Sequence, residues 1–328
     1  MTSGPFPAND MLTYVAQRLL AIVFILFVMS LLIFGITQVM PGNVAYMIVG
    51  QFATPDVVAA IETKLGLHDP IYVQYWRWAS GVLRGDLGQS LIMERPVGPL
   101  IAEAMARSAI LAGVAFVCVA VLGIVLGVVA AVRKDSPTDN AISVFTYLGI
   151  SVPEFFWGIV LILVFARYLN WLPSGGIGDP AFGLPVDPRY LILPAITLTF
   201  ALIAHVSRLT RSSMLEAMRS NYVRFARAKG LAEALVVRRH ALRNALLPTI
   251  TVLAIDVGFL IGGIVVVETV FSYPGLGRLL LFAIERHDLP LIQASILIIA
   301  TIYCTANLVA DILYAYFNPK IRYGRPAQ

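Results

Sequence analysis

Six long apolar runs constrain this chain more than any other feature of its sequence. Each run approaches the roughly 20 residues that a helix needs to cross a bilayer. Of the 328 residues, 59% are hydrophobic and only 13% are charged, whereas a soluble domain carries about 25% charged residues. The chain has too few polar residues to cover the surface of a protein in water, so lipid must surround much of it. We therefore predict an all-α, polytopic membrane protein with six transmembrane helices. The expected spans are Leu19–Met40, Ala109–Val132, Ile142–Ala166, Tyr190–Val206, Leu246–Phe271 and Leu291–Phe317.

Polar residues border the first and fourth spans. Residues 1–17 form a short polar lead that contains two prolines, and we expect this lead to be disordered. The fourth run is the shortest of the six, so we expect its helix to continue past Arg208. The first helix is therefore expected to start close to Arg18 and the fourth to end beyond its apolar run.

The distribution of Lys and Arg predicts the orientation in the membrane. Six spans put both termini on one side. Fifteen basic residues fall on that side, and four fall in the short loops of the other side. The long loop over residues 41–108 is set aside, because long loops translocate largely regardless of charge. The positive-inside rule therefore predicts a plasma (inner) membrane protein with cytoplasmic N- and C-termini.

The only long polar interval in the C-terminal half is Glu216–Pro248. On a period of 3.6 residues, Met218, Tyr222 and Phe225 share one face. Gly230 is a typical helix stop, and a second helical pattern follows it. We expect a helix, a tight turn and a helix on the aqueous side of the membrane. The basic residues of the interval are Arg219, Arg224, Arg227, Lys229, Arg238, Arg239 and Arg243.

Three interpretations of this basic interval are open. Its charge could be only a topology signal, since cytoplasmic loops are rich in Lys and Arg. Its amphipathic helix could lie on the lipid surface. It could also form a docking surface for a soluble partner. The glycine between two helices, with a face of aromatic and small residues, favours docking. That face comprises Tyr222, Phe225, Ala226 and Ala228.

The interval resembles the cytoplasmic loop of permease subunits of ABC importers, in the branch for dipeptides, oligopeptides, glutathione and nickel. Two strings carry the resemblance there, YVRFARAKGL (Tyr222–Leu231) and RRHALRNALLP (Arg238–Pro248). Where the wider superfamily has a Glu-Ala-Ala triplet, this chain reads Arg224, Phe225, Ala226. Further matching strings are MPGN (Met40–Asn43), LGLHDP (Leu65–Pro70), GDLGQS (Gly85–Ser90), ETVFSYPGLGRLL (Glu268–Leu280) and YAYFNPKIRYG (Tyr314–Gly324).

The resemblance implies one permease domain over residues 1–328 with the MetI-like fold. Residues 41–108 would form an external loop, and residues 208–245 a cytoplasmic coupling loop. The implied partners are a second homologous permease, two ATP-binding subunits that bind ATP and Mg, and an external solute-binding protein. The solute would be small, with di- or oligopeptides first among the candidates. The implied ATPase-docking residues are Tyr222, Phe225, Ala226, Arg227, Ala228, Lys229, Gly230 and Leu231.

The external loop contains two helical patterns, Thr54–Gly66 and Ile71–Leu83. The second pattern carries Tyr72, Trp76 and two further aromatic residues. Aromatic residues of this kind often lie at a membrane interface. A contact with the external binding protein is the alternative.

Four carboxylates fall within or near the spans, where they are costly unless they face a partner or water. Glu154 follows Pro153, and we expect a kinked, pore-facing segment that makes Glu154, Phe155 and Trp157 candidates for the translocation pathway. Asp256 is a fourth pathway candidate. An internal hydrogen bond between helices is the alternative for Asp256 and for Asp311. We expect Glu268 to be wetted near a span end.

Catalytic chemistry has no recognisable motif in this sequence. There is no Gly-Lys pair for a P-loop, no His-Glu-x-x-His motif and no Gly-x-Ser-x-Gly elbow. Cys118 and Cys304 both lie in apolar spans, where they are expected to be small buried hydrophobes. We therefore expect no catalytic residue, no metal site and no cofactor in this chain. Nucleic acid is not an expected partner, because much of the positive charge lies in short loops beside apolar spans.

One rival class remains open from sequence. An ion-coupled secondary transporter or channel would use Glu154 and Asp256 as relays, and it would work without ATP. An intramembrane enzyme would need a nucleophile–base pair or a metal set, and the sequence offers neither.

Overall fold

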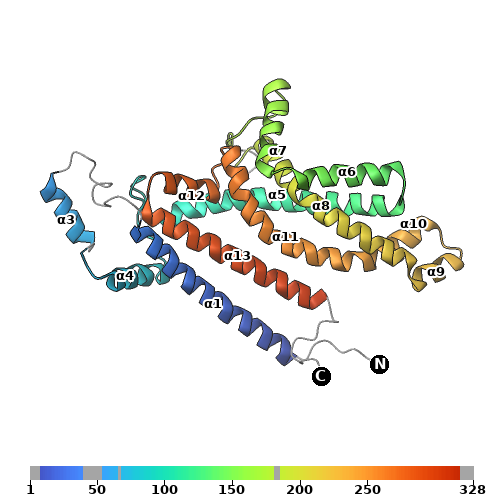
Figure 1. Ribbon diagram of the computed structural model, residues 1–328, viewed down its shortest axis with the longest axis horizontal. Helices are drawn as coiled ribbons and strands as arrows, with labels where there is room; N and C mark the ends of the chain where they lie inside the picture. The colour runs from blue at the N-terminus through green and yellow to red at the C-terminus, as the bar shows by residue number, and fades with distance from the viewer. Residues whose placement is uncertain (1–7, 40–53, 66–67, 181–184, 318–328) are drawn as a thin grey trace. The chain divides into compact units, whose positions relative to one another are not determined.

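The structure, a computed structural model, describes residues 8–39, 54–65, 68–180 and 185–317 (Figure 1). Over these ranges every regular element is a helix, apart from an isolated bridge between Gln89 and Pro96. Five helices are long and apolar enough to cross a membrane, and a sharply bent pair makes a sixth if it counts as one span. The prediction of an all-helical, multi-span membrane protein is therefore confirmed.

The long helices are α1 (Ala8–Val39), α5 (Val97–Val132), α8 (Arg189–Arg219), α11 (Leu242–Val270) and α13 (Leu289–Phe317). The shorter elements are α3 (Pro55–Leu65), α4 (Ile71–Leu83), α6 (Pro137–Ser151), α7 (Glu154–Leu161), η1 (Ile162–Tyr168), α9 (Asn221–Ala228), α10 (Glu233–Leu235), η2 (Val236–Ala241) and α12 (Leu276–Glu285). The predicted strings at residues 40–43 and 318–324 lie outside the described residues.

Three helix boundaries differ from a simple reading of the apolar runs. The helix α1 begins at Ala8, so the prediction of a disordered lead is wrong for residues 8–17. The helix α5 begins at Val97, because the apolar residues before the second span continue the helical pattern into a buried cluster. As expected, α8 continues past Arg208 and ends at Arg219.

The third span is broken rather than continuous. The helices α6 and α7 are bent by 106° at a short break, which is far sharper than the kink expected at Pro153. The residue before a proline avoids the helical region, and Val152 accordingly has φ −111° and ψ 132°. Gly149 lets α6 approach α8 closely, because a Cβ there would lie 2.6 Å from the carbonyl oxygen of Phe200.

The described helices pack into two compact units. Of the described residues, the first comprises 8–18, 107–180, 185–274 and 305–317, and the second comprises 19–39, 54–65, 68–106 and 275–304. This division does not test the prediction of one permease domain, which stays a prediction. Each unit has its own buried apolar cluster.

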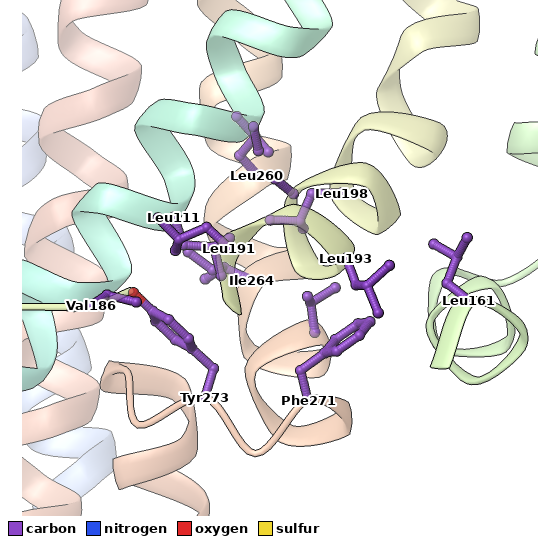
Figure 2. Close-up of a cluster of buried hydrophobic side chains, with 13 residues drawn as sticks. Leu111, Leu161, Val186, Leu191, Leu193, Leu198, Leu260, Ile264, Phe271 and Tyr273 are labelled. Atoms are coloured by element: carbon purple, nitrogen blue, oxygen red, sulfur yellow. The ribbon is translucent and has the colours of Figure 1, made fainter. Parts of the chain in front are cut away.

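The main apolar cluster of the first unit joins α5, α8 and α11 (Figure 2). Leu111, Leu198 and Leu260 come from these three helices and are all buried. After α11, the turn places Phe271 and Tyr273 in the same cluster, and Figure 2 shows both rings beside the leucines. The three helices therefore form one continuously packed body within this unit.

A buried carboxylate lies at the end of this cluster. Glu268 is fully buried, and Ser108 Oγ lies 2.5 Å from Glu268 Oε1. The Tyr273 hydroxyl donates to the backbone oxygen of Arg107 at 2.8 Å. The expectation that Glu268 is wetted is therefore wrong, because the turn after α11 folds back over the end of its helix.

A second buried carboxylate organises the second unit. Asp288 is fully buried, and its carboxylate accepts hydrogen bonds from Ser90 Oγ at 2.5 Å and from the backbone amide of Ile92 at 3.3 Å. Gly88, in the GDLGQS string, has φ +80°, a conformation that suits glycine. Asp288 therefore ties the chain before α5 to the chain before α13.

We predict that Asp288→Ala lowers the thermal stability of the purified transporter. The substitution leaves the buried Ser90 hydroxyl and nearby amides without their acceptor, which costs about 1–3 kcal/mol. The matched control is Asp69→Ala, since Asp69 lies in the same unit but forms an exposed ion pair with Arg77 worth at most about 1 kcal/mol. Equal shifts of the unfolding midpoint for the two variants would contradict the structural role of Asp288.

Candidate coupling and translocation sites

The basic interval folds as short helices at the end of α8 (Figure 1). The helix α8 stops at Arg219 because Ser220 adopts an extended conformation, with φ −68° and ψ 155°. The helix α9 then runs over residues 221–228. Gly230 follows with φ +76°, and its amide donates to the carbonyl of Arg227 at 2.9 Å. The predicted helix, glycine turn and second helix are therefore present, with one additional break at Ser220.

The inner face of α9 is buried against the same chain. Val223 is 0% and Ala226 is 6% exposed. They belong to an apolar cluster, here called the mount, that α5, α8, η2 and α11 also build. The buried members of the mount are Ala131, Met214, Ala217, Val223, Ala226, Val236, Ala241 and Ala245.

The outer face of α9 is uncovered in this chain. Phe225 is 69% and Tyr222 is 42% exposed, and Ala228 is exposed beside them. We call the outward residues the docking surface, and they are Tyr222, Arg224, Phe225, Ala228, Lys229 and Leu231.

The face expected from periodicity is corrected in two places. The sequence pattern predicts an outward position for Ala226, but Ala226 lies in the mount, where its small side chain lets α9 approach the rest of the chain. Met218 was placed on one face with Tyr222 and Phe225, but it belongs to α8. The break at Ser220 restarts the helix, so the 3.6-residue phase does not carry through from α8 to α9.

An ion pair closes the turn around Gly230. Arg227 Nε and Nη2 lie 3.0 and 2.5 Å from the two carboxylate oxygens of Glu233. This hydrogen-bonded pair raises the pKa of Arg227 above its usual value. Paired forks of this kind fix geometry as well as charge. Arg227 therefore joins the end of α9 to the start of α10, and its charge is paired although the side chain stays exposed.

A second ion pair, which sequence reasoning missed, fixes α8 against α6. Arg211 Nε and Nη2 lie 2.7 and 2.6 Å from the carboxylate oxygens of Asp139. Asp139 is buried and sits in the first turn of α6, where Ser136 caps the helix. The cap sequence Ser-Pro-Thr-Asp predicts a helix start, but nothing local in the sequence points to its partner 72 residues away.

Glu154 sits in a notch on α11. It lies in the first turn of α7, and a Cβ added at Gly263 would come within 2.7 Å of Glu154 Oε2. Within the described ranges, no residue forms a hydrogen bond or an ion pair with its carboxylate. Its neighbour Phe155 is 48% exposed. Glu154 is therefore a carboxylate in a span that has no partner within the described part of this chain.

Trp157 lies one turn after Glu154, and its side chain is directed toward α8 of the same chain. Its ring packs against Phe200 of α8, with ring centroids 5.2 Å apart and the ring planes tilted by 45°. Its indole nitrogen is buried and has no hydrogen-bond partner among the described residues. Trp157 therefore anchors α7 to α8, whereas Phe155 points outward.

Asp256 is held inside the first unit by His205. Asp256 is 0% exposed, and its Oδ1 lies 2.9 Å from Nδ1 of His205 on α8. The internal hydrogen bond considered for Asp256 is therefore present. Asp311 likewise pairs with Arg18 at 3.1 Å.

Glu154 and Asp256 lie at different levels along α11. Asp256 lies seven residues before Gly263, the residue that Glu154 meets, and this separation is about 10 Å along the helix axis.

A metal site finds no support in the described residues. Over the ranges that the structure covers, no group of three or more His, Cys, Asp or Glu side chains could hold an ion.

Comparison with known proteins agrees with this arrangement. Residues 123–323 match the family described as the binding-protein-dependent transport system inner membrane component. Residues 11–97 match the N-terminal family of the membrane components of the same transport systems.

Curated relatives cover nearly the whole chain. The chain is 40% identical over 313 residues to the glutathione transport system permease protein GsiC of Escherichia coli. The match covers 95% of this chain and 100% of the relative. The Salmonella paratyphi A protein of the same name is 38% identical over 313 residues, with the same coverage.

A solved structure supports the fold. A chain of the MetNI methionine ABC transporter, in an inward-facing conformation, is similar with a TM-score of 0.55 and 15% sequence identity. The similarity covers 67% of this chain and 96% of that chain. With both family matches and the curated relatives, the chain belongs to the inner-membrane components of binding-protein-dependent transport systems, as a permease subunit of an ABC importer.

Proposed function

We propose that this permease imports di- or oligopeptides, including glutathione-like solutes, and that α9 is the element through which ATP hydrolysis drives it. The finer assembly proposed is a second homologous permease, two ATP-binding subunits that hold ATP and Mg, and an external solute-binding protein. The proposed orientation has both termini in the cytoplasm, as the loop charge indicates. One observation carries the proposal: an exposed aromatic docking surface sits on a fully buried mount.

The two faces of α9 suit a lever. The docking surface offers Phe225 and Tyr222, and aromatic residues dominate the binding energy of protein interfaces. The mount connects the opposite face to α8 and α11, so a displacement of α9 has to move these helices or break apolar packing. Thr210 of α8 and Thr249 of α11 are buried and lie 3.2 Å apart. Movement of the docked ATPases would therefore be passed to two long helices together.

The substrate proposal rests on charge and on the relatives. The curated relatives are named for glutathione transport, and peptide-like solutes carry an α-ammonium group. Glu154 provides an unpartnered carboxylate beside the exposed Phe155. We propose that Glu154 meets the cationic end of the solute in the translocation pathway. Asp256 and Trp157 would shape the pathway indirectly, because their side chains are turned toward α8.

We predict that Phe225→Ala and Ala228→Trp uncouple transport without preventing membrane insertion. Both residues are exposed, so the first loses an interface anchor and the second obstructs the groove of the partner. A central aromatic anchor contributes about 2 kcal/mol or more, a roughly 30-fold loss of affinity. The measurement is co-purification of the ATP-binding subunits, with ATP-dependent uptake by reconstituted vesicles.

The matched control is Tyr147→Ala, because Tyr147 is an exposed aromatic residue on α6 and lies outside the docking surface. It should retain the ATP-binding subunits. If Phe225→Ala and Ala228→Trp retain these subunits and transport normally, the basic interval is only a topology signal and the docking proposal fails.

We predict a difference between two substitutions at Gly230. In the described part of the chain, no atom beyond the adjacent residues lies within 4 Å of a Cβ added there, so the positive φ is what restricts the residue. Asparagine tolerates this conformation, whereas a β-branched residue is strained by about 1–2 kcal/mol. Gly230→Asn should therefore keep coupled uptake, and Gly230→Val should lose much of it. Equal activity of the two variants would show that the turn geometry does not matter.

We predict that Gly263→Ala impairs uptake of cationic peptides and that Gly262→Ala does not. Both changes favour the helix by a similar amount. Only the Cβ at position 263 meets the Glu154 carboxylate, since among the described residues nothing beyond the helix's own backbone lies within 4 Å of a Cβ at position 262. Gly263→Ala and Glu154→Gln should each lower uptake about tenfold, equivalent to about 1.4 kcal/mol. If Glu154→Gln transports normally while the ATP-binding subunits stay coupled, Glu154 has no pathway role.

A further inference from the structure

The external helix α4 has two separate apolar faces. One face packs on α1: the rings of Tyr75 and Trp78 lie 5.5 and 5.8 Å from the ring of Phe34. The Tyr75 hydroxyl also lies 2.9 Å from Ser30 Oγ. These contacts fall within the second compact unit, and they place α4 beside α1 (Figure 1).

The second apolar face of α4 is uncovered. Tyr72, Trp76 and Leu83 are 69%, 65% and 85% exposed. Their spacing of four and then seven residues puts them on one stripe of the helix. Exposed aromatic and aliphatic side chains in a continuous stripe indicate contact with lipid or with another protein.

The level at which α4 packs on α1 favours lipid over another protein as the contact of this exposed stripe. Its contacts fall on Ser30, Phe34 and Gln38 of α1. The first of these lies nine residues before the end of α1 at Val39, or about 13 Å along the axis. Leu32, at the same level of α1, is 53% exposed, and α1 is one of the five candidate spans. If α1 spans the bilayer, the lipid around its exposed side reaches the level where α4 packs.

The remaining side of α4 is polar. Arg77 Nη2 lies 2.6 Å from Asp69 Oδ2 in an exposed ion pair. The Gln74 amide donates to the backbone oxygen of Asp69 at 2.8 Å. A short helix with an aromatic stripe and a charged side is typical of helices that lie in the membrane–water interface.

We propose that α4 is an interfacial helix anchored in the leaflet that covers the C-terminal end of α1. Tyr72, Trp76 and Leu83 lie at the boundary between headgroups and acyl chains, and the Arg77–Asp69 pair lies among the headgroups. On the orientation proposed above, this is the outer leaflet. The anchor fixes the start of the external segment against α1, independently of how α9 binds its partners.

The test is the depth of spin labels in the complete transporter, reconstituted into vesicles of phosphatidylethanolamine and phosphatidylglycerol. Labels are attached to Trp76→Cys and Arg77→Cys in a chain in which Cys118 and Cys304 are replaced by alanine. Leu32→Cys on α1 serves as the hydrocarbon reference. Collision with oxygen reports lipid, and collision with a nickel chelate reports water.

The expected result is a clear difference between neighbouring positions. The label at position 76 should collide with oxygen several-fold more than with the nickel chelate, as at position 32, and the label at position 77 should show the reverse. Equal nickel accessibility at positions 76 and 77 overturns the proposal. Protection of position 76 only when the solute-binding protein is added would identify a protein-docking face and would also overturn it.

A second measurement needs no label. Lipids brominated on the acyl chains should quench part of the tryptophan emission, and the conservative change Trp76→Phe should reduce the quenched fraction. Trp171→Phe is the control, because Trp171 lies in the other compact unit and is also exposed. An unchanged quenched fraction in Trp76→Phe would contradict burial of Trp76 in the interface.

Discussion

The packing of α9 against its own chain is the contact on which this account of the permease depends. An exposed docking helix can transmit force only if its other face is fixed. Val223 and Ala226 fix it, because both are buried among side chains from α5, α8, η2 and α11. The ion pair between Arg227 and Glu233 then holds the turn that follows. We therefore propose that the docking surface and the long helices move as one packed body within the first unit.

The carboxylates within the spans differ in whether another residue of the chain pairs with them. A carboxylate in an apolar environment is costly unless it is paired or faces water. Asp256 is paired with His205, and Glu268 lies beside Ser108. Glu154 differs, since its carboxylate fits a glycine notch on α11 and no described residue pairs with it. This contrast separates the proposed pathway carboxylate from the carboxylates that join helices.

The sequence was sufficient for features that depend on local pattern. Apolar runs predicted the spans, and the glycine signal predicted the turn at Gly230. Features set by distant partners could not be predicted: Ser90 meets Asp288 across 198 positions, and Asp139 meets Arg211 across 72. The burial of Ala226 was also missed, because the period within α9 does not show which side of this short helix meets η2 and α11. A kink was expected at Pro153, but the 106° bend depends on how α6 and α7 each pack on α8.

The most direct test of the account is a distance measurement across the mount. Spin labels on Asn221→Cys of α9 and Ser212→Cys of α8, both exposed positions outside the docking surface, report that distance by pulsed electron resonance in a chain with Cys118 and Cys304 replaced by alanine. The complete transporter is compared without ATP and with ATP trapped in hydrolysis-deficient ATPases, and a label pair between this chain and the partner permease reports the conformational switch. The account predicts that the distance within the chain stays constant while the distance to the partner permease changes. A change of several ångströms within the chain would show that α9 moves independently of α8 and would contradict the account.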